Sequence, residues 1–243
     1  MTDASTFLVI GIRPSSTQAL LSNPVRFKIS GMILSLGDLS PLLGLPPGPD
    51  LSAALARVLP GLQEYEDKVY PDATYRNYYG LGVSLCFVPS PLKLDSIDIF
   101  NLPPKAPTSS STKPQYAPPP SLLLAFADPE VVLPPRKKGE KEIRYPRPSL
   151  TMERDTAGRD IVRSLGEPSR KGAGGWVGVW LEWSPVALTT AGERAEVGIM
   201  LELTDPKAEP SSEDKAKGVG GVWDRAAGWP WASIKVFRTT PKK

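Results

Sequence analysis

The chain has 243 residues, a formal charge of +3 and an apolar fraction of 40%, which is typical of one large or two small globular domains. It contains no histidine and a single cysteine, Cys86. These counts exclude imidazole-based catalysis, histidine-ligated metals and an intrachain disulfide, and we expect no metal and no cofactor.

The amino-terminal segment carries no basic region, and its first apolar run, Phe7–Ile12, is too short for a signal peptide or membrane helix. We expect strands at Phe7–Ile12 and Arg26–Leu34. The lone cysteine lies in an apolar run and is expected to be a core residue rather than a nucleophile. The protein is therefore expected to be intracellular and cytoplasmic.

The phrase Leu-Gly-x-Pro occurs twice, at Leu43–Pro46 and Leu165–Pro168. A glycine in the left-handed conformation closes a helix, and the proline prevents the helix from restarting. A strand-hairpin pattern follows each copy along the chain. The sequence therefore predicts either two related helix–hairpin units or two independent uses of a common helix ending.

The clearest helix is expected at Leu51–Leu59, with Asp50 as its cap and Pro60 as its stop. Apolar residues alternate with polar ones in several segments, which is the period of strands with one buried face. The alternating apolar positions are Val83, Leu85, Phe87, Ile97 and Ile99 in the first half, and Val177, Val179, Leu181, Trp183, Ile199, Leu201, Leu203, Ile234 and Val236 in the second. The predicted fold class is α+β, with antiparallel sheets and a few covering helices.

Proline and glycine mark the expected boundaries between the parts of the chain. Residues 102–120 contain seven prolines around small polar residues, which is typical of a linker. We therefore divide the chain into a first α+β unit at 1–101, a proline-rich linker with a basic loop at 102–150, and a second α+β unit at 151–243. A disordered insertion is expected near 205–221.

All six tryptophans follow residue 175, and Trp223, Trp229 and Trp231 lie close together. Tryptophan is enriched at partner surfaces because a large apolar ring carries a polar N–H. These three residues are the predicted partner-binding site. The alternative is that the rings close a hydrophobic core, and only their exposure distinguishes the two.

One basic cluster, formed by Arg136, Lys137, Lys138 and Lys141, lies in a proline-flanked loop. It is predicted to contact an anionic surface, and it could equally be a nuclear import sequence or a solvated loop. The small overall charge and the absence of a long basic stripe argue against nucleic-acid binding.

The segments Tyr75–Phe87 and Leu94–Asn101 resemble the Asn-Tyr-aromatic-x-Leu-Gly strand pair of the eukaryotic phagophore-associated autophagy-factor family, long catalogued as uncharacterised. That resemblance implies a non-enzymatic adaptor recruited to membranes. The family continues with a histidine-containing motif where this chain has Leu102-Pro103-Pro104, so no functional residue is carried over. In the segment Ile161–Trp183, a predicted helix, the phrase Leu-Gly-x-Pro and a predicted strand follow one another. This order is similar to that of small lipoproteins of bacterial outer-membrane assembly, and the resemblance implies helices that pack on an antiparallel sheet.

The predicted function is that of a non-enzymatic interaction or adaptor protein that binds a protein partner through its tryptophan-rich carboxy-terminal segment. An alternative is a peripheral membrane protein, in which the tryptophans and the basic loop bind anionic lipid. A third is an enzyme that uses serine, lysine or carboxylates without histidine. The sequence leaves the partner and the oligomeric state open.

Overall fold

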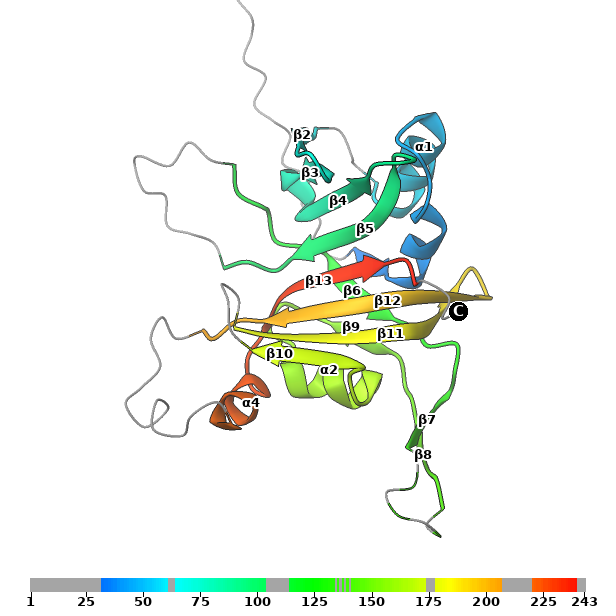
Figure 1. Ribbon diagram of the computed structural model, residues 1–243, viewed down its shortest axis with the longest axis vertical. Helices are drawn as coiled ribbons and strands as arrows, with labels where there is room; N and C mark the ends of the chain where they lie inside the picture. Colours follow the sequence, from blue (N-terminus) through cyan, green and yellow to red (C-terminus); the bar gives the residue numbers. More distant parts are fainter. Residues whose placement is uncertain are drawn as a thin grey trace, which may run out of the picture.

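The computed structural model describes residues 32–60, 64–103, 114–133, 135, 137, 139, 141–173, 178–206 and 220–239. Within these ranges, an eight-stranded sheet forms the centre of the molecule (Figure 1). Its strands, in spatial order, are β10 (Arg170–Ala173), β11 (Val179–Thr190), β12 (Glu193–Leu203), β13 (Trp231–Phe237), β5 (Lys93–Phe100), β4 (Val83–Val88), β3 (Thr74–Tyr78) and β2 (Glu66–Val69). Every neighbouring pair is antiparallel, as predicted.

The sheet consists of two four-stranded meanders, β2–β5 and β10–β13, which meet in the middle. Each meander contributes its last strand to the junction, where β5 and β13 pair from Ser96↔Phe237 to Phe100↔Ser233. The alternating segments of the sequence analysis therefore form strands, apart from Val177, which lies outside the described residues, and the fold is α+β. The predicted strand Phe7–Ile12 lies outside the described residues, and of Arg26–Leu34 only residues 32–34 are described.

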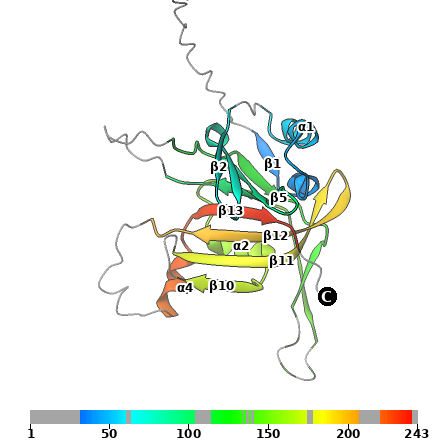
Figure 2. The same cartoon turned by 45° about the horizontal axis from the view of Figure 1, so that its top comes forward.

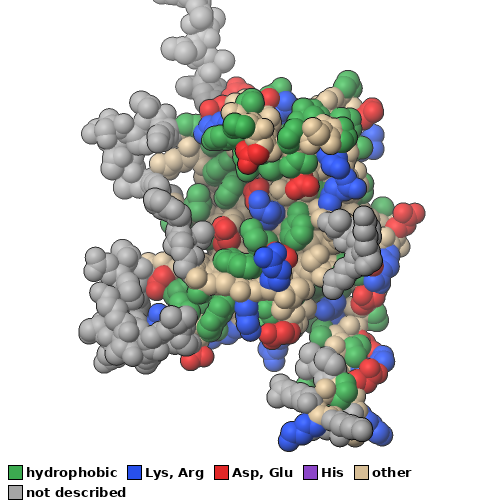
Figure 3. All heavy atoms as spheres, viewed as in Figure 1, with side chains coloured by type: hydrophobic (Ala, Val, Ile, Leu, Met, Phe, Trp, Pro, Cys, Tyr) green, Lys and Arg blue, Asp and Glu red, His purple; other side chains and the backbone are tan. Residues whose placement is uncertain are grey.

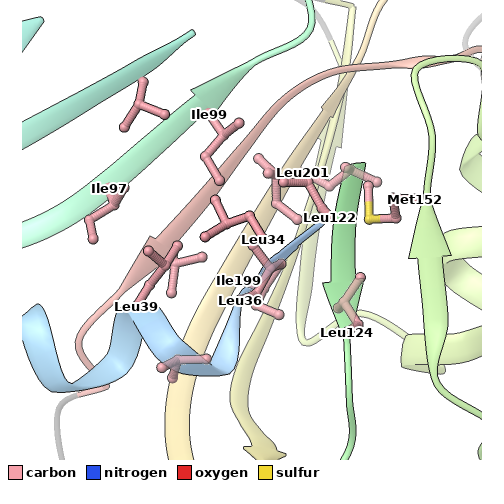
Figure 4. Packing of buried hydrophobic residues seen from close by; sticks show 14 of the residues in the cluster. Leu34, Leu36, Leu39, Ile97, Ile99, Leu122, Leu124, Met152, Ile199 and Leu201 are labelled. Atoms are coloured by element: carbon pink, nitrogen blue, oxygen red, sulfur yellow. The ribbon is translucent and has the colours of Figure 1, made fainter. Parts of the chain in front are cut away.

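A second, three-stranded sheet packs against one face of the large sheet. It contains β1 (Ile33–Ser35), β6 (Ser121–Leu124) and β9 (Leu150–Met152), with β6 parallel to β1 and antiparallel to β9. Side chains from both sheets, such as Leu34, Leu122 and Leu201, point toward one another in the space between them (Figure 4). This layer is the hydrophobic core.

Short helices close the edges of this core. They are the 3-10 helices η1 (Gly37–Leu42) and η2 (Tyr79–Leu81) and the α-helices α1 (Pro49–Val58), α2 (Gly158–Leu165) and α4 (Gly220–Ala226). Gly44 and Gly166 have φ angles of 90° and 85°, so both copies of Leu-Gly-x-Pro use glycine where other residues would be strained. The predicted helix at Leu51–Leu59 is α1, but Gly48 occupies its N-cap position and Asp50 lies in the first turn.

The two predicted units and the predicted linker all contribute residues to the same core. The predicted linker contributes β6, whose Leu122 and Leu124 are fully buried, and its last residue begins β9. The helix η1 of the first unit packs on β11 of the second, and a Cβ atom at Gly37 would lie 2.2 Å from the Thr189 carbonyl oxygen. The β6 segment of the predicted linker is therefore part of the core, and one core contains residues of both predicted units.

A two-stranded ribbon extends away from this body in both ribbon views (Figures 1 and 2). It contains β7 (Glu130–Leu133) and β8 (Ile143–Pro146), paired antiparallel from Glu130↔Pro146 to Leu133↔Ile143. The connection between these strands carries the basic cluster of the sequence analysis. Most of the predicted insertion near 205–221, residues 207–219, lies outside the described residues.

Candidate functional site: the open face of the sheet

Trp229 and Trp231 belong to the core, with only 8% and 1% of their surfaces exposed. The Trp231 indole N–H donates to the Glu153 carbonyl oxygen at 2.7 Å, so the polar atom of the ring is also satisfied internally. The prediction that these two residues form a partner-binding surface is therefore corrected. The rings close the core, which was the alternative interpretation.

Trp223 is half-buried in α4, and the Lys171 ammonium lies 5.8 Å from its ring centre. Lys137 and Lys141 are exposed at the end of the β7–β8 ribbon, whereas Arg136 and Lys138 lie outside the described residues. The helix α4 and the ribbon lie at different corners of the molecule in Figures 1 and 2. The structure therefore does not bring the predicted aromatic and basic residues together.

A different surface combines aromatic and polar side chains. We call it the open face: the side of the large sheet turned away from the three-stranded sheet, formed by the side chains that alternate with the core residues. Figure 3 shows hydrophobic and charged side chains of both signs interspersed over the large sheet. The buried polar residues of this face are Asn77, Ser84, Ser96, Asp98 and Ser233.

An ion pair occupies the centre of the open face, at the junction of the two meanders. Lys235 Nζ lies 3.1 Å from Asp98 Oδ1, and the side chains are 28% and 11% exposed. Burial raises the pKa of the Asp98 carboxyl, although the Lys235 ammonium opposes this effect. Burial lowers the pKa of Lys235, but the Asp98 carboxylate outweighs it and the net pKa is raised. Each charge therefore favours the charged form of the other.

Two aromatic rings lie directly over glycines of the large sheet. A Cβ atom on Gly172 would fall 2.5 Å from the Trp180 ring, and one on Gly198 would fall 2.2 Å from the Phe237 ring. Glycine at these positions lets each ring lie flat on the backbone of the neighbouring strand. The β10–β13 half of the open face therefore presents aromatic rings close to the sheet.

Cys86 lies on the open face but is 7% exposed, and burial raises the pKa of its thiol. Because the thiolate is the reactive species, we expect Ellman's reagent to modify the native protein at least an order of magnitude more slowly than the urea-unfolded chain. The measurement is the rate of absorbance increase with and without urea. Equal rates would contradict this burial and reopen a nucleophilic role for Cys86.

A hydrogen-bonded network orders the β2–β5 half of the open face. Asn77 Oδ1 accepts hydrogen bonds from the Ser84 hydroxyl at 2.8 Å and the Tyr116 hydroxyl at 2.7 Å. The Tyr116 ring stacks on Phe100 with 4.3 Å between ring centres and lies 4.8 Å from Tyr79. Burial raises the pKa of Tyr116 to about 12, so its hydroxyl remains a donor at neutral pH. These contacts fix the segment around Tyr116 against the sheet.

Beside this network lies a pocket of about 770 Å³, which we call the tyrosine pocket. Four of the seven tyrosines line it, together with two carboxylates, one lysine, one asparagine and one proline. The lining residues are Glu66, Lys68, Tyr70, Asp72, Tyr75, Asn77, Tyr79, Pro114 and Tyr116. Sequence reasoning missed this pocket, although the run of tyrosines from Tyr75 to Tyr79 contains part of it.

Lys68 lies within the tyrosine pocket, close to a tyrosine ring and a carboxylate. The Lys68 ammonium lies 5.6 Å from the centre of the Tyr79 ring and 4.0 Å from the Glu66 carboxylate. A side-chain hydrogen bond to Tyr79 is the first cause of the raised pKa of Lys68, and burial opposes it. A cation thus already lies near an aromatic face and a carboxylate, and Asp72 adds a second carboxylate to the lining.

The described residues contain no cluster of three or more Cys, Asp or Glu side chains placed to hold a metal ion. None of the helices in those ranges combines the length and apolar composition that crossing a bilayer requires. No protein-family model, no curated protein and no solved structure matches this chain.

Proposed function

We propose that this protein is a non-enzymatic interaction module that binds an extended segment of a protein partner at the tyrosine pocket. The observation that carries the proposal is a pocket of about 770 Å³ in which four tyrosine rings meet two carboxylates. Aromatic-lined grooves with acidic neighbours suit extended peptides, because rigid rings offer large contact area at low entropic cost.

The pocket lies beside the end of the sheet, which favours an extended occupant. β2 is the terminal strand of the large sheet, and all four of its residues are exposed. A peptide strand that pairs alongside β2 would place alternate side chains over Glu66 and Lys68, which line the pocket. Main-chain hydrogen bonds would supply affinity, and the pocket would select the side chain.

The side chain that best fits this lining is arginine. A guanidinium stacks on tyrosine rings and pairs with carboxylates, and it binds more strongly to both than a hydrated ammonium does. Glu66 and Asp72 outnumber Lys68 among the charged lining residues, so a cationic side chain is favoured over an anionic one. The segments that resemble the autophagy-factor family contain most of β3, β4 and β5, which support this face, and the adaptor role that the resemblance implies agrees with the proposal.

A displayed library of short random peptides tests this function directly. Peptides enriched on the full chain are expected to share an arginine, and their affinity is expected to fall about tenfold or more in Glu66→Lys/Asp72→Lys, because two attractive carboxylates become repulsive cations. Fluorescence anisotropy of an enriched peptide measures the change. Both side chains line an open pocket, and the Glu66–Lys68 ion pair is exposed, so folding should be unaffected.

The matched control is Glu167→Lys/Glu193→Lys, which makes the same charge change at two exposed positions outside the tyrosine pocket. It is expected to retain wild-type affinity. Enriched peptides without a cationic residue, or equal weakening in the control, would contradict the assignment of arginine to the pocket. An absence of enriched peptides would contradict the interaction function at this site.

A further inference from the structure

The β7–β8 ribbon exposes large apolar side chains far from the tyrosine pocket. Val132, Ile143 and Tyr145 are 45%, 53% and 49% exposed. The ribbon pairs only four residues of each strand, and it extends away from the body in Figures 1 and 2. A ribbon of this size gains little stability from its own contacts, and these exposed apolar side chains do not belong to the core.

The exposed apolar side chains lie on both sides of the ribbon. In the β7–β8 register Val132 pairs with Arg144, whereas Ile143 and Tyr145 alternate with Arg144 along β8. Ile143 and Tyr145 therefore share one side of the ribbon, and Val132 lies on the other. A flat protein surface would cover only one side, but a lipid bilayer would surround both.

Basic side chains lie beyond the apolar ones, at the end of the ribbon. Lys137 and Lys141 are exposed there, and blue side chains gather at this end in Figure 3. Arg144 pairs with Glu142 at 2.5 Å and with Glu130 at 3.2 Å, so the charge of this arginine is neutralised within the ribbon. Lys137 and Lys141 place positive charge at the end of the ribbon.

We propose that the β7–β8 ribbon docks onto an anionic lipid bilayer, with Ile143, Tyr145 and Val132 in the headgroup region and Lys137 and Lys141 on acidic headgroups. A tyrosine with an apolar isoleucine neighbour is typical of a membrane interface. Four paired residues span roughly 13 Å, enough for the shallow insertion of about 5–10 Å that interfacial segments make. This inference does not depend on the function proposed for the tyrosine pocket.

Co-sedimentation of the full chain with vesicles tests the proposal. The protein is expected to bind vesicles that contain both phosphatidylserine and phosphatidylcholine. This binding is expected to weaken as salt is added, and on vesicles of pure phosphatidylcholine it is expected to fall to background.

Substitutions in the ribbon test which side chains bind the bilayer. Ile143→Asp/Tyr145→Asp is expected to lower the partition coefficient about tenfold or more, because two carboxylates replace the inserted side chains. Lys137→Glu/Lys141→Glu is expected to abolish the preference for phosphatidylserine. Leu92→Asp, at an exposed apolar residue of the β4–β5 turn, is the matched control and should bind normally.

A second measurement detects insertion itself. Tyr145→Cys, labelled with an environment-sensitive fluorophore while Cys86 stays buried, is expected to shift its emission to the blue when phosphatidylserine vesicles are added. Ile143→Ser/Tyr145→Ser provides a milder loss-of-binding variant if the aspartates disturb folding, which circular dichroism reveals. Failure of the wild-type chain to bind these vesicles overturns the proposal. So does binding that survives all ribbon substitutions, or a label that does not shift.

Discussion

Replacement of Trp231 by alanine is expected to destabilise the folded protein by about 3–5 kcal/mol, the usual cost of truncating a buried tryptophan. The ring is 1% exposed, and its N–H donates to the Glu153 carbonyl oxygen. Alanine would therefore leave a cavity in the core and an unpaired carbonyl beside it. Urea denaturation followed by far-UV circular dichroism would measure the loss as a lower unfolding midpoint.

Trp223→Ala is the matched control, because Trp223 is half-buried at the edge of the same core. It removes the same side chain and is expected to cost less than about 2 kcal/mol. A Trp231→Ala protein as stable as the wild type would contradict the burial of this ring. If the Trp231→Ala protein were stable and also lost a bound partner, Trp231 would be a surface residue that binds the partner.

The second large effect is expected for Lys235→Met, which removes the cation beside the buried Asp98 carboxylate. Methionine keeps most of the side-chain volume, so the loss reports on charge rather than packing. At neutral pH we expect a destabilisation of about 2–3 kcal/mol, below the full cost of breaking a completely buried pair because water reaches part of Lys235. Urea denaturation at neutral pH measures this loss.

The pH dependence of this variant identifies Asp98 as the cause. Burial raises the pKa of the Asp98 carboxyl in the folded chain, so the folded state binds its proton more tightly than the unfolded state does. The carboxyl therefore favours folding most at low pH and becomes a cost as the pH rises through its folded pKa. Because Lys235→Met enlarges that cost, the stability gap to the wild type is expected to shrink as the pH falls.

The double variant Asp98→Asn/Lys235→Met removes both charges and is expected to recover most of the lost stability at neutral pH. The single variant Asp98→Asn completes the double-mutant cycle between Asp98 and Lys235. A gap that stays constant with pH, or a double variant no more stable than Lys235→Met, would show that the aliphatic part of Lys235 matters and its charge does not.

The strands and helix endings followed from the sequence because they depend on local patterns. Alternation at Val83, Leu85 and Phe87 predicts a strand, and β4 is that strand, although Ser84 and Cys86 on its other face are buried as well. The glycine of each Leu-Gly-x-Pro copy was expected to adopt a positive φ angle, and Gly44 and Gly166 do. Each of these features is decided within a few residues, so the sequence is sufficient to predict it.

The division of the chain into units and the position of the candidate site could not be predicted from local sequence patterns. The segment predicted as a linker also supplies Leu122 and Leu124 to the core, because β6 finds partners in β1 and β9 from distant parts of the chain. Tyr116 reaches the tyrosine pocket through its bond to Asn77, 39 residues away in sequence. Such pairings depend on contacts that composition and spacing do not encode.

The sequence by itself determined the α+β class, the antiparallel pattern, the helix endings and the exclusion of histidine chemistry, because those depend on composition and on short-range periodicity. Only the tertiary structure decided that Trp229 and Trp231 are core residues, that one sheet joins both halves, and that four tyrosines form a pocket. The physical reason is that burial is a property of the assembled layers: the same indole ring binds a partner or fills a core according to which strands cover it.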